Sequence, residues 1–329
     1  MCASGKVTSP QPGYFARKAT WDGLDALDRC RWTMRGMCAR HPRWVFCEAS
    51  AAIAHGLSVS WREADVLHLA TSLTAPVASR TGLRRHPIRP GRVMVVDDMR
   101  VTSPERCAFD CLRRMGFRDG LALADSYLRK TGMDRDAFMD QIVAHHHGER
   151  DIGRALSIAR HADGRAESGG ESIARATMIE LGFELPELQA EVPDPFAPGR
   201  DYRVDFLWTL PDGNRVAGEL DGREKYVNPQ MTKGRSAIEV LAAERLRESR
   251  LSATGAAVMR FSYADVLDIA FFKQLLDRFG IPRDHDTNAG RAHRRRYKER
   301  WQRTCIGTWL LNTRRIWPPR RRARDARHS

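Results

Sequence analysis

The stretch YRVDFLWTLPDGNRVAGELDGREK, residues 202–225, decides the fold that we expect for the C-terminal half of the chain. Apolar and polar side chains alternate through 203–208 and again through 216–221, which is the pattern of strands with one buried face. Between these two runs, the segment LPDG at 210–213 has the residues of a tight loop, because proline presets the first turn position and glycine accepts φ > 0 at the last. The sequence therefore predicts a β-hairpin.

The register of this hairpin gathers acidic side chains. If the loop places Leu210 opposite Asn214, the same register places Asp205 opposite Glu219 further along the ladder. Opposed residues share a face, with Cβ atoms roughly 5 Å apart, and Asp221 falls on that face too. Clustered carboxylates repel one another unless a cation such as Mg²⁺ or Mn²⁺ neutralises them. We expect either a metal site made by these three acids or an ordinary solvated strand face.

The order of the acids resembles a known nuclease superfamily. A helix with an acid, then Asp205 on a strand, then Glu219-x-Asp221-Gly222 on the next strand, resembles the PD-(D/E)XK nucleases. The chain is most similar to the small domains related to very-short-patch-repair endonucleases. The similarity runs from about residue 168 to 267 and includes ESIARATMIELGFELPELQAEV and EVLAAERLRESRLSATGAAVMRFSYADV. The resemblance implies a restriction-endonuclease-like α/β fold, with a mixed sheet flanked by helices, that binds a divalent metal and cleaves DNA phosphodiesters.

The same resemblance implies roles for five residues. Glu171 takes the place of the helical acid, although it also fits the third helical position of a capping box that begins at Ser168. Asp205 and Glu219 would hold Mg²⁺ or Mn²⁺, and Asp221 would be a further ligand or would orient a water. The superfamily has a lysine two residues after the acid at 219, where this chain has Asp221. Lys225 is a candidate replacement for that lysine, by position only.

One further polar residue is expected at this site. Gln189 belongs to the predicted strand 188–192, which precedes the hairpin, and we expect its side chain to point toward the same acids. After the hairpin, 233–251 is expected to form a long helix and 256–261 a buried strand. On that helix, Arg245 and Arg250 are candidate phosphate contacts, with a solvated face as the alternative.

The N-terminal half resembles a different family. The segments VFCEASAAIAHGL, VTSPERCAFDCLRRMG and GLALADSYLR, within 45–129, resemble the middle region of the abortive-infection type IV antitoxins. That family implies a smaller α+β domain with a role in toxin neutralisation or transcriptional control, and a cognate toxin protein as partner. It usually binds DNA through an N-terminal winged helix. Such a module would have to lie before Phe46, where the chain is poorly patterned.

Charge is concentrated at the C-terminal end. The chain has 329 residues and a net charge of +14, of which residues 286–329 carry +11. Arginine runs alternate there with Trp301, Trp309 and Trp317, a composition suited to phosphate contact and base stacking. An unstructured basic extension explains the same composition. The positive balance therefore belongs to the tail and not to the predicted folded part.

Composition also bears on location and on other metal sites. The sequence has no apolar run long enough to span a membrane, and 1–18 lacks the apolar segment of a signal peptide, so we expect a cytoplasmic protein. Its seven cysteines have no paired spacing and are expected to stay reduced. Three consecutive histidines, 145–147, would point in different directions on a helix and cannot form one ligand set, so we expect them on a solvated face or in a loop.

These features predict a divalent-metal-dependent DNA endonuclease. The alternative is a non-catalytic type IV antitoxin or transcriptional regulator that binds DNA with a degenerate nuclease fold. Both hypotheses have DNA as a partner and neither involves a membrane. The predicted organisation is a poorly patterned segment at 1–45, an antitoxin-like domain at 46–150, a nuclease-like domain at 168–285 and a basic, disordered tail at 286–329.

Overall fold

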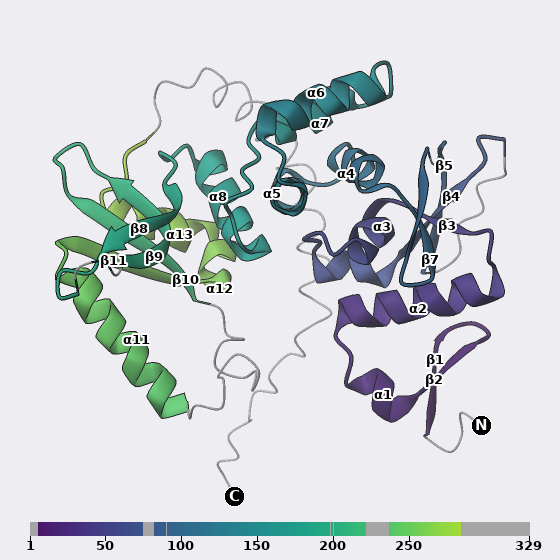
Figure 1. The fold of residues 1–329 in the computed structure, drawn as a ribbon, viewed down its shortest axis with the longest axis horizontal. Helices are drawn as coiled ribbons and strands as arrows, with labels where there is room; N and C mark the ends of the chain where they lie inside the picture. Colours follow the sequence, from purple (N-terminus) through teal and green to yellow (C-terminus); the bar gives the residue numbers. More distant parts are fainter. Residues whose placement is uncertain are drawn as a thin grey trace, which may run out of the picture.

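The structure is a computed structural model that describes residues 6–74, 82–89, 91–197, 199, 201–221 and 237–283. It has a mixed α/β architecture, with two larger sheets flanked by helices. In Figure 1 the N-terminal unit lies to the right and the C-terminal unit to the left, with helices α5 and α8 between them. Lys225 and the basic tail lie outside the described residues. None of the described helices combines the length and apolar character needed to cross a membrane.

The N-terminal unit is built on a five-stranded mixed sheet in the order β5-β4-β3-β7-β6. Strand β4 pairs with β5 in parallel and with β3 antiparallel, while β3 and β7 are parallel. Helix α3 packs against this sheet, α4 packs on α3, and α4 to α7 pack on one another. The elements are β3 (Val45–Phe46), α3 (Glu48–Ala54), η2 (Trp61–Asp65), β4 (Leu67–Thr71), β5 (Leu83–Pro87), β6 (Val93–Val96), β7 (Met99–Thr102), α4 (Pro104–Leu112), α5 (Phe117–Thr131), α6 (Arg135–His146) and α7 (Ile152–Ala159).

Residues before Phe46 are more regular than their sequence predicts. They form a hairpin, β1 (Val7–Gln11) and β2 (Tyr14–Arg17), followed by α1 (Lys18–Asp22) and α2 (Ala26–Arg40). Helix α2 buries a stripe in the core of the N-terminal unit, made of Cys30, Met34, Met37 and Cys38. This stripe is weak in the sequence because cysteines and methionines replace leucines and charged residues surround it. The poor patterning of 1–45 therefore did not mean absence of structure.

The C-terminal unit has a four-stranded sheet in the order β11-β10-β9-β8. Its elements are α8 (Gly169–Leu181), β8 (Glu187–Pro193), β9 (Asp201–Thr209), β10 (Arg215–Asp221), α11 (Ala237–Ser252), β11 (Ala256–Ser262), α12 (Tyr263–Leu267) and α13 (Ile269–Arg278). Strands β8, β9 and β10 are successively antiparallel, and β11 joins β10 in parallel. Phe206, Phe261 and Phe272 fill the core under this sheet.

The hairpin predicted from the sequence is present with the predicted register. The Leu210 N–H donates to the Asn214 carbonyl at 2.7 Å, and the loop glycine, Gly213, has a φ of 83°. Trp208 pairs with Val216 and Phe206 with Gly218. Val204, Phe206 and Trp208 are buried as the alternation predicted, so the period-two pattern and the loop chemistry were enough to define this hairpin.

Helix α8 belongs to both units. Its Ala176 packs in the core of the N-terminal unit, while Ala174 and Met178 pack in the core under the C-terminal sheet. The same helix carries Arg175, which forms a buried, two-pronged ion pair with Asp125 of α5 at 2.7 and 2.8 Å. The two units are therefore joined by shared packing and by a buried charge pair.

The three histidines at 145–147 do not behave alike. His146 is buried, stacks on Phe109 with ring centroids 3.8 Å apart, and lies between two glutamates. Its Nε2 is 2.7 Å from Glu105 and its Nδ1 is 3.0 Å from Glu149. Because the glutamates contact opposite ring nitrogens, the arrangement is an ion-pair bridge between α4 and the end of α6. The expectation of a solvated or loop position was wrong for this histidine.

This bridge predicts a pH-dependent contribution to stability. Burial by itself lowers the pKa of His146, but hydrogen bonds with Glu105 and Glu149 outweigh it, so the pKa lies above the ordinary value. A raised histidine pKa means that the contribution is fully present below the unfolded value, about 6.5, and is lost as pH rises through the folded value. Glu105→Gln should lower the pKa of His146. The variant should therefore lose less stability than the wild type as pH rises from the unfolded to the folded pKa of His146.

The measurement is an NMR titration of the His146 ring together with urea unfolding at several pH values from about 6 upward. Asp136→Asn, an exposed acid on the same helix α6, is the control and should leave the His146 titration unchanged. An unaltered His146 pKa in Glu105→Gln would contradict the bridge.

Candidate functional site

Three of the polar side chains expected at the nuclease-like site meet in the structure. The amide Nε2 of Gln189 donates to Glu171 Oε2 at 2.9 Å and lies 3.4 Å from Asp205 Oδ1. Glu171 comes from α8, Gln189 from β8 and Asp205 from β9, so one amide connects a helix and two strands. The prediction that Gln189 points toward the acids is confirmed.

Local structure explains how Glu171 is held. The Ser168 hydroxyl accepts a hydrogen bond from the Glu171 N–H at 3.1 Å, which caps helix α8 as predicted. The Glu171 carboxylate does not complete the expected capping box, since it accepts from the N–H of Glu167 at 2.8 Å. Burial raises the pKa of Glu171, and the negative charge of Asp205 adds to the rise. This acid is thus more easily protonated than an exposed glutamate.

Gln189 adopts a backbone conformation that is unusual for a strand. Its φ is 53°, although its neighbours Leu188 and Ala190 pair regularly with Phe206 and Val204. A left-handed conformation costs a residue with a side chain on the order of 1 kcal/mol or more, and such strain often accompanies functional sites. Here the strained residue is the one whose amide lies between the two acids.

Asp205 also connects its strand to the next one. Its Oδ2 accepts a hydrogen bond from the Leu220 N–H at 2.9 Å, beyond the last regular pair of the β9–β10 ladder. This contact fixes β10 at the point where Glu219 and Asp221 lie. The predicted acids are therefore carried by neighbouring strands.

Both acids of β10 are paired with arginines. Arg247 of α11 binds Glu219 through two hydrogen bonds of 2.8 and 2.9 Å, and it also donates to the Arg203 carbonyl at 2.7 Å. Arg260 of β11, which lies directly beside Glu219 in the sheet, binds Asp221. The negative charge of these two acids is thus balanced by cationic side chains.

The predicted metal set is only partly assembled. Carboxylate oxygens suit Mg²⁺ or Mn²⁺. In Asp205, Oδ1 contacts the Gln189 amide and Oδ2 accepts a hydrogen bond from the Leu220 N–H. A cation bound by Glu219 or Asp221 would displace an arginine. Within the described residues, these acids do not form a group of three converging ligand atoms. Metal binding by Asp205, Glu219 and Asp221 stays a prediction, and Lys225 lies outside the described residues.

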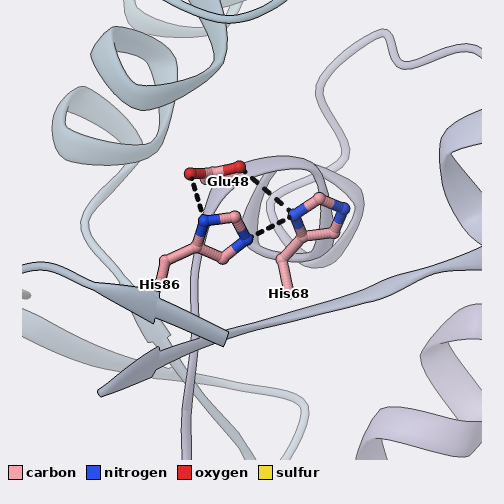
Figure 2. A group of neighbouring side chains, drawn as sticks. All are labelled: Glu48, His68 and His86. Carbon is pink, nitrogen blue, oxygen red and sulfur yellow. Dashed lines mark hydrogen bonds and ion pairs between the residues drawn. The ribbon is translucent and has the colours of Figure 1, made fainter. Parts of the chain in front are cut away.

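A second cluster, which the sequence did not indicate, could hold a metal ion. Glu48, His68 and His86 gather in the N-terminal unit, with one ligand atom from each all within 4.8 Å of one another. Figure 2 shows the two rings side by side below the carboxylate. His68 Nδ1 is 3.2 Å from Glu48 Oε2 and 2.9 Å from His86 Nε2, and His86 Nδ1 is 2.9 Å from Glu48 Oε1.

Three elements bring this cluster together. Glu48 is the first residue of α3, His68 lies on β4 and His86 on β5. In the parallel pairing His86 is opposite Ala70. His68 is two residues before Ala70 and therefore lies on the same face of the sheet. The two imidazole planes are nearly parallel, at 7°, with centroids 5.0 Å apart.

The cluster contains an ionised carboxylate in a buried position. Burial alone would raise the pKa of Glu48, but the neighbouring imidazoles of His68 and His86, with the charge of Arg114, lower it to about 2. Arg114 Nε lies 2.9 Å from Glu48 Oε1. Since its pKa is far below neutrality, Glu48 is an anion at physiological pH and can bind a cation.

Sequence spacing explains why this cluster was missed. Its three members are separated by 20 and 18 positions, and each stands alone in an otherwise apolar or basic segment. Zinc motifs are readable in a sequence when two ligands are a few residues apart. Only the sheet pairing and the start of α3 bring these residues together.

Comparisons with known proteins give few relatives. No family model matches the chain, and no solved structure matches it. Two relatives, each titled an uncharacterized protein of Mycobacterium tuberculosis, from strain CDC 1551 / Oshkosh and strain ATCC 25618 / H37Rv, are 36% identical over 148 residues. The match covers 45% of this chain and 52% of each relative, so the chain spans about half the length of the curated relatives it matches.

Proposed function

We propose that the C-terminal unit hydrolyses DNA phosphodiester bonds with the help of a divalent metal ion. The observation that carries this proposal is the meeting of Glu171, Gln189 and Asp205 beside the acids of β10. Glu171 lies on helix α8, Asp205 on strand β9 and Glu219 on the next strand, β10. This order agrees with what the resemblance to the PD-(D/E)XK nucleases implies. The strained backbone of Gln189 further supports a functional role for this surface.

Asp205 and Glu219 would hold the ion, Mg²⁺ or Mn²⁺. When bound, such an ion polarises the phosphate and lowers the pKa of a water molecule. Gln189 keeps Asp205 and Glu171 in fixed positions, and Glu171, with its raised pKa, can accept or return a proton. Before metal binds, Arg247 neutralises Glu219.

Arginines can replace the cationic group that the superfamily lysine supplies. Arg260 reaches Asp221 from the neighbouring strand, and Arg247 reaches Glu219 from α11. With an ion held by Glu219, the guanidinium of Arg247 would be available to bind a phosphate oxygen, to which arginine binds strongly. DNA contact is further favoured by the net charge of +11 in residues 286–329.

A second candidate function is a DNA-binding regulator or antitoxin without nuclease activity. It is favoured by the same arginine pairs, which balance Glu219 and Asp221 without any metal. A cognate toxin protein would then be a partner of the N-terminal unit. This candidate predicts a mobility shift on DNA and no cutting.

The two candidates are separated by incubating the purified protein with mismatched, nicked and single-stranded DNA and either Mg²⁺ or Mn²⁺. The nuclease predicts cutting by the wild type that chelator abolishes and that Glu219→Gln loses. Because this substitution also weakens the pair with Arg247, its unfolding curve must confirm that the variant is folded at the assay temperature. Binding without cutting on every substrate would favour the regulator.

A further inference from the structure

We propose that Glu48, His68 and His86 hold one Zn²⁺ ion that fastens the start of α3 to strands β4 and β5. Two imidazole nitrogens with one carboxylate oxygen are a donor set that proteins use for zinc, whereas Mg²⁺ prefers oxygen ligands alone. The site is in the N-terminal unit and is independent of the proposed nuclease site on the C-terminal sheet.

The separations of the ligand atoms fit one shared ion. Around a tetrahedral zinc with bonds of about 2.0–2.2 Å, neighbouring donor atoms lie roughly 3.3 Å apart. His68 Nδ1 is 3.2 Å from Glu48 Oε2 and 2.9 Å from His86 Nε2, and the three ligand atoms all lie within 4.8 Å of one another. These two separations lie within a few tenths of an ångström of the spacing expected around zinc.

Proton counting also favours a cation in the cluster. A ring nitrogen carries at most one proton, yet His68 Nδ1 lies close to both Glu48 Oε2 and His86 Nε2. If His68 Nδ1 carries a proton it can donate to only one of them, and if it accepts a proton from His86 Nε2 its lone pair cannot bond the Glu48 oxygen. Glu48 Oε1 has His86 Nδ1 and Arg114 Nε within 2.9 Å, but neither is aligned for a hydrogen bond. A cation between the three side chains could take one lone pair from each of them at once.

Burial and backbone strain support a bound ligand. The side chains of Glu48, His68 and His86 are only 4–6% exposed, and burying polar groups is costly unless each has a bonding partner, which Glu48 Oε1 lacks among its hydrogen bonds. Glu48 also has a φ of 48°, a conformation that glutamate rarely adopts. An ion bound to its carboxylate would help to keep the residue in this conformation.

Arg114 provides a test that leaves the ligands intact. Its guanidinium lies beside Glu48 and its side chain is 50% exposed, so Arg114→Gln should fold normally. Removing a positive charge next to the ligand should strengthen zinc binding several-fold, by Coulomb attraction. If Glu48 only forms an ion pair with Arg114 and does not bind zinc, Arg114→Gln will leave the zinc affinity of the chain unchanged.

The experiment measures zinc binding to the full-length chain, without a histidine tag, after removal of metal by chelator. Calorimetric titration should find one equivalent of Zn²⁺ per chain that is lost in His68→Gln and His86→Gln, with affinity falling on the order of 100-fold or more. His146→Gln is the matched control, because this buried histidine also contacts two glutamates but from opposite ring nitrogens, and it should keep the equivalent. Glu219→Gln should keep it too.

Two further measurements decide the proposal if the histidine variants fail to fold. Zn²⁺ should raise the melting temperature of the wild type, since it binds the folded state, and the effect should be larger in Arg114→Gln. Co²⁺ should give the visible absorption of a four-coordinate site. The proposal is overturned if the wild type binds no zinc, or if the folded His68→Gln variant keeps the same equivalent as His146→Gln.

Discussion

Replacing Arg175 with methionine is expected to lower the free energy of unfolding by about 3–5 kcal/mol, because it leaves a buried carboxylate without its counter-ion. Asp125 has no exposed side-chain surface and Arg175 is 5% exposed. The guanidinium contacts both oxygens of Asp125 and also donates to the His161 carbonyl at 2.7 Å. Methionine fills a similar volume but makes none of these contacts.

The stability lost in Arg175→Met should depend on pH. Burial raises the pKa of Asp125, and the charge of Arg175 opposes this rise. Without the arginine the folded pKa rises further above the unfolded value of about 3.9. For an acid with a raised pKa, stability falls as pH rises from the unfolded toward the folded value. The variant should therefore lose less stability at about pH 5 than at about pH 7.

Urea unfolding checks both expectations. The control is Arg165→Met, which breaks an ion pair with Asp163 in which the arginine is 59% exposed, and it should cost less than about 1 kcal/mol. Combining Arg175→Met with Asp125→Leu should recover much of the loss, since no buried charge remains. If Arg175→Met is as stable as the control Arg165→Met, the stabilising role of the Arg175–Asp125 pair is refuted.

The second large effect concerns Asp205 and rests on the proposed nuclease activity. Asp205→Asn should slow metal-dependent DNA cutting at least about 100-fold, because a lost metal ligand costs several kcal/mol of stabilisation and each 1.36 kcal/mol is tenfold. Asparagine keeps an oxygen that can accept the Leu220 N–H. The free energy of unfolding should therefore change far less than the rate.

Single-turnover cutting assays measure the change in rate, and unfolding curves measure the change in the free energy of unfolding. Asp201→Asn is the matched control, an exposed acid at the start of the same strand, and it should cut like the wild type. The asparagine variant should also lower the pKa of Glu171, since the charge of Asp205 contributes to its rise. Equal cutting by both variants would remove Asp205 from the site.

Sequence patterns were most informative where structure depends on neighbours along the chain. The hairpin register followed from the LPDG loop and from alternation, and the Ser168 cap from a single helix start. The position of Gln189 was also predicted. Its left-handed backbone was not, because nothing in a strand pattern encodes a positive φ for glutamine.

Long-range ion pairs could not be predicted in the same way. Arg247 and Arg260 lie 28 and 39 positions from the acids they bind, and the predicted helix offered several arginines without distinguishing this one. The pairs change an expectation drawn from the acids alone. Glu219→Gln would have relieved repulsion in a bare acidic cluster, but here it removes the partner of Arg247 and should destabilise the protein.

Helix α8 cannot be assigned to one of the two units alone. Its residues complete both hydrophobic cores, and its Arg175 requires a carboxylate from α5. A recombination event that joined this C-terminal unit to a new N-terminal partner would leave apolar surface and an unmatched arginine at the junction. Neither unit therefore has a complete core, or a paired Arg175, when it is separated from the other.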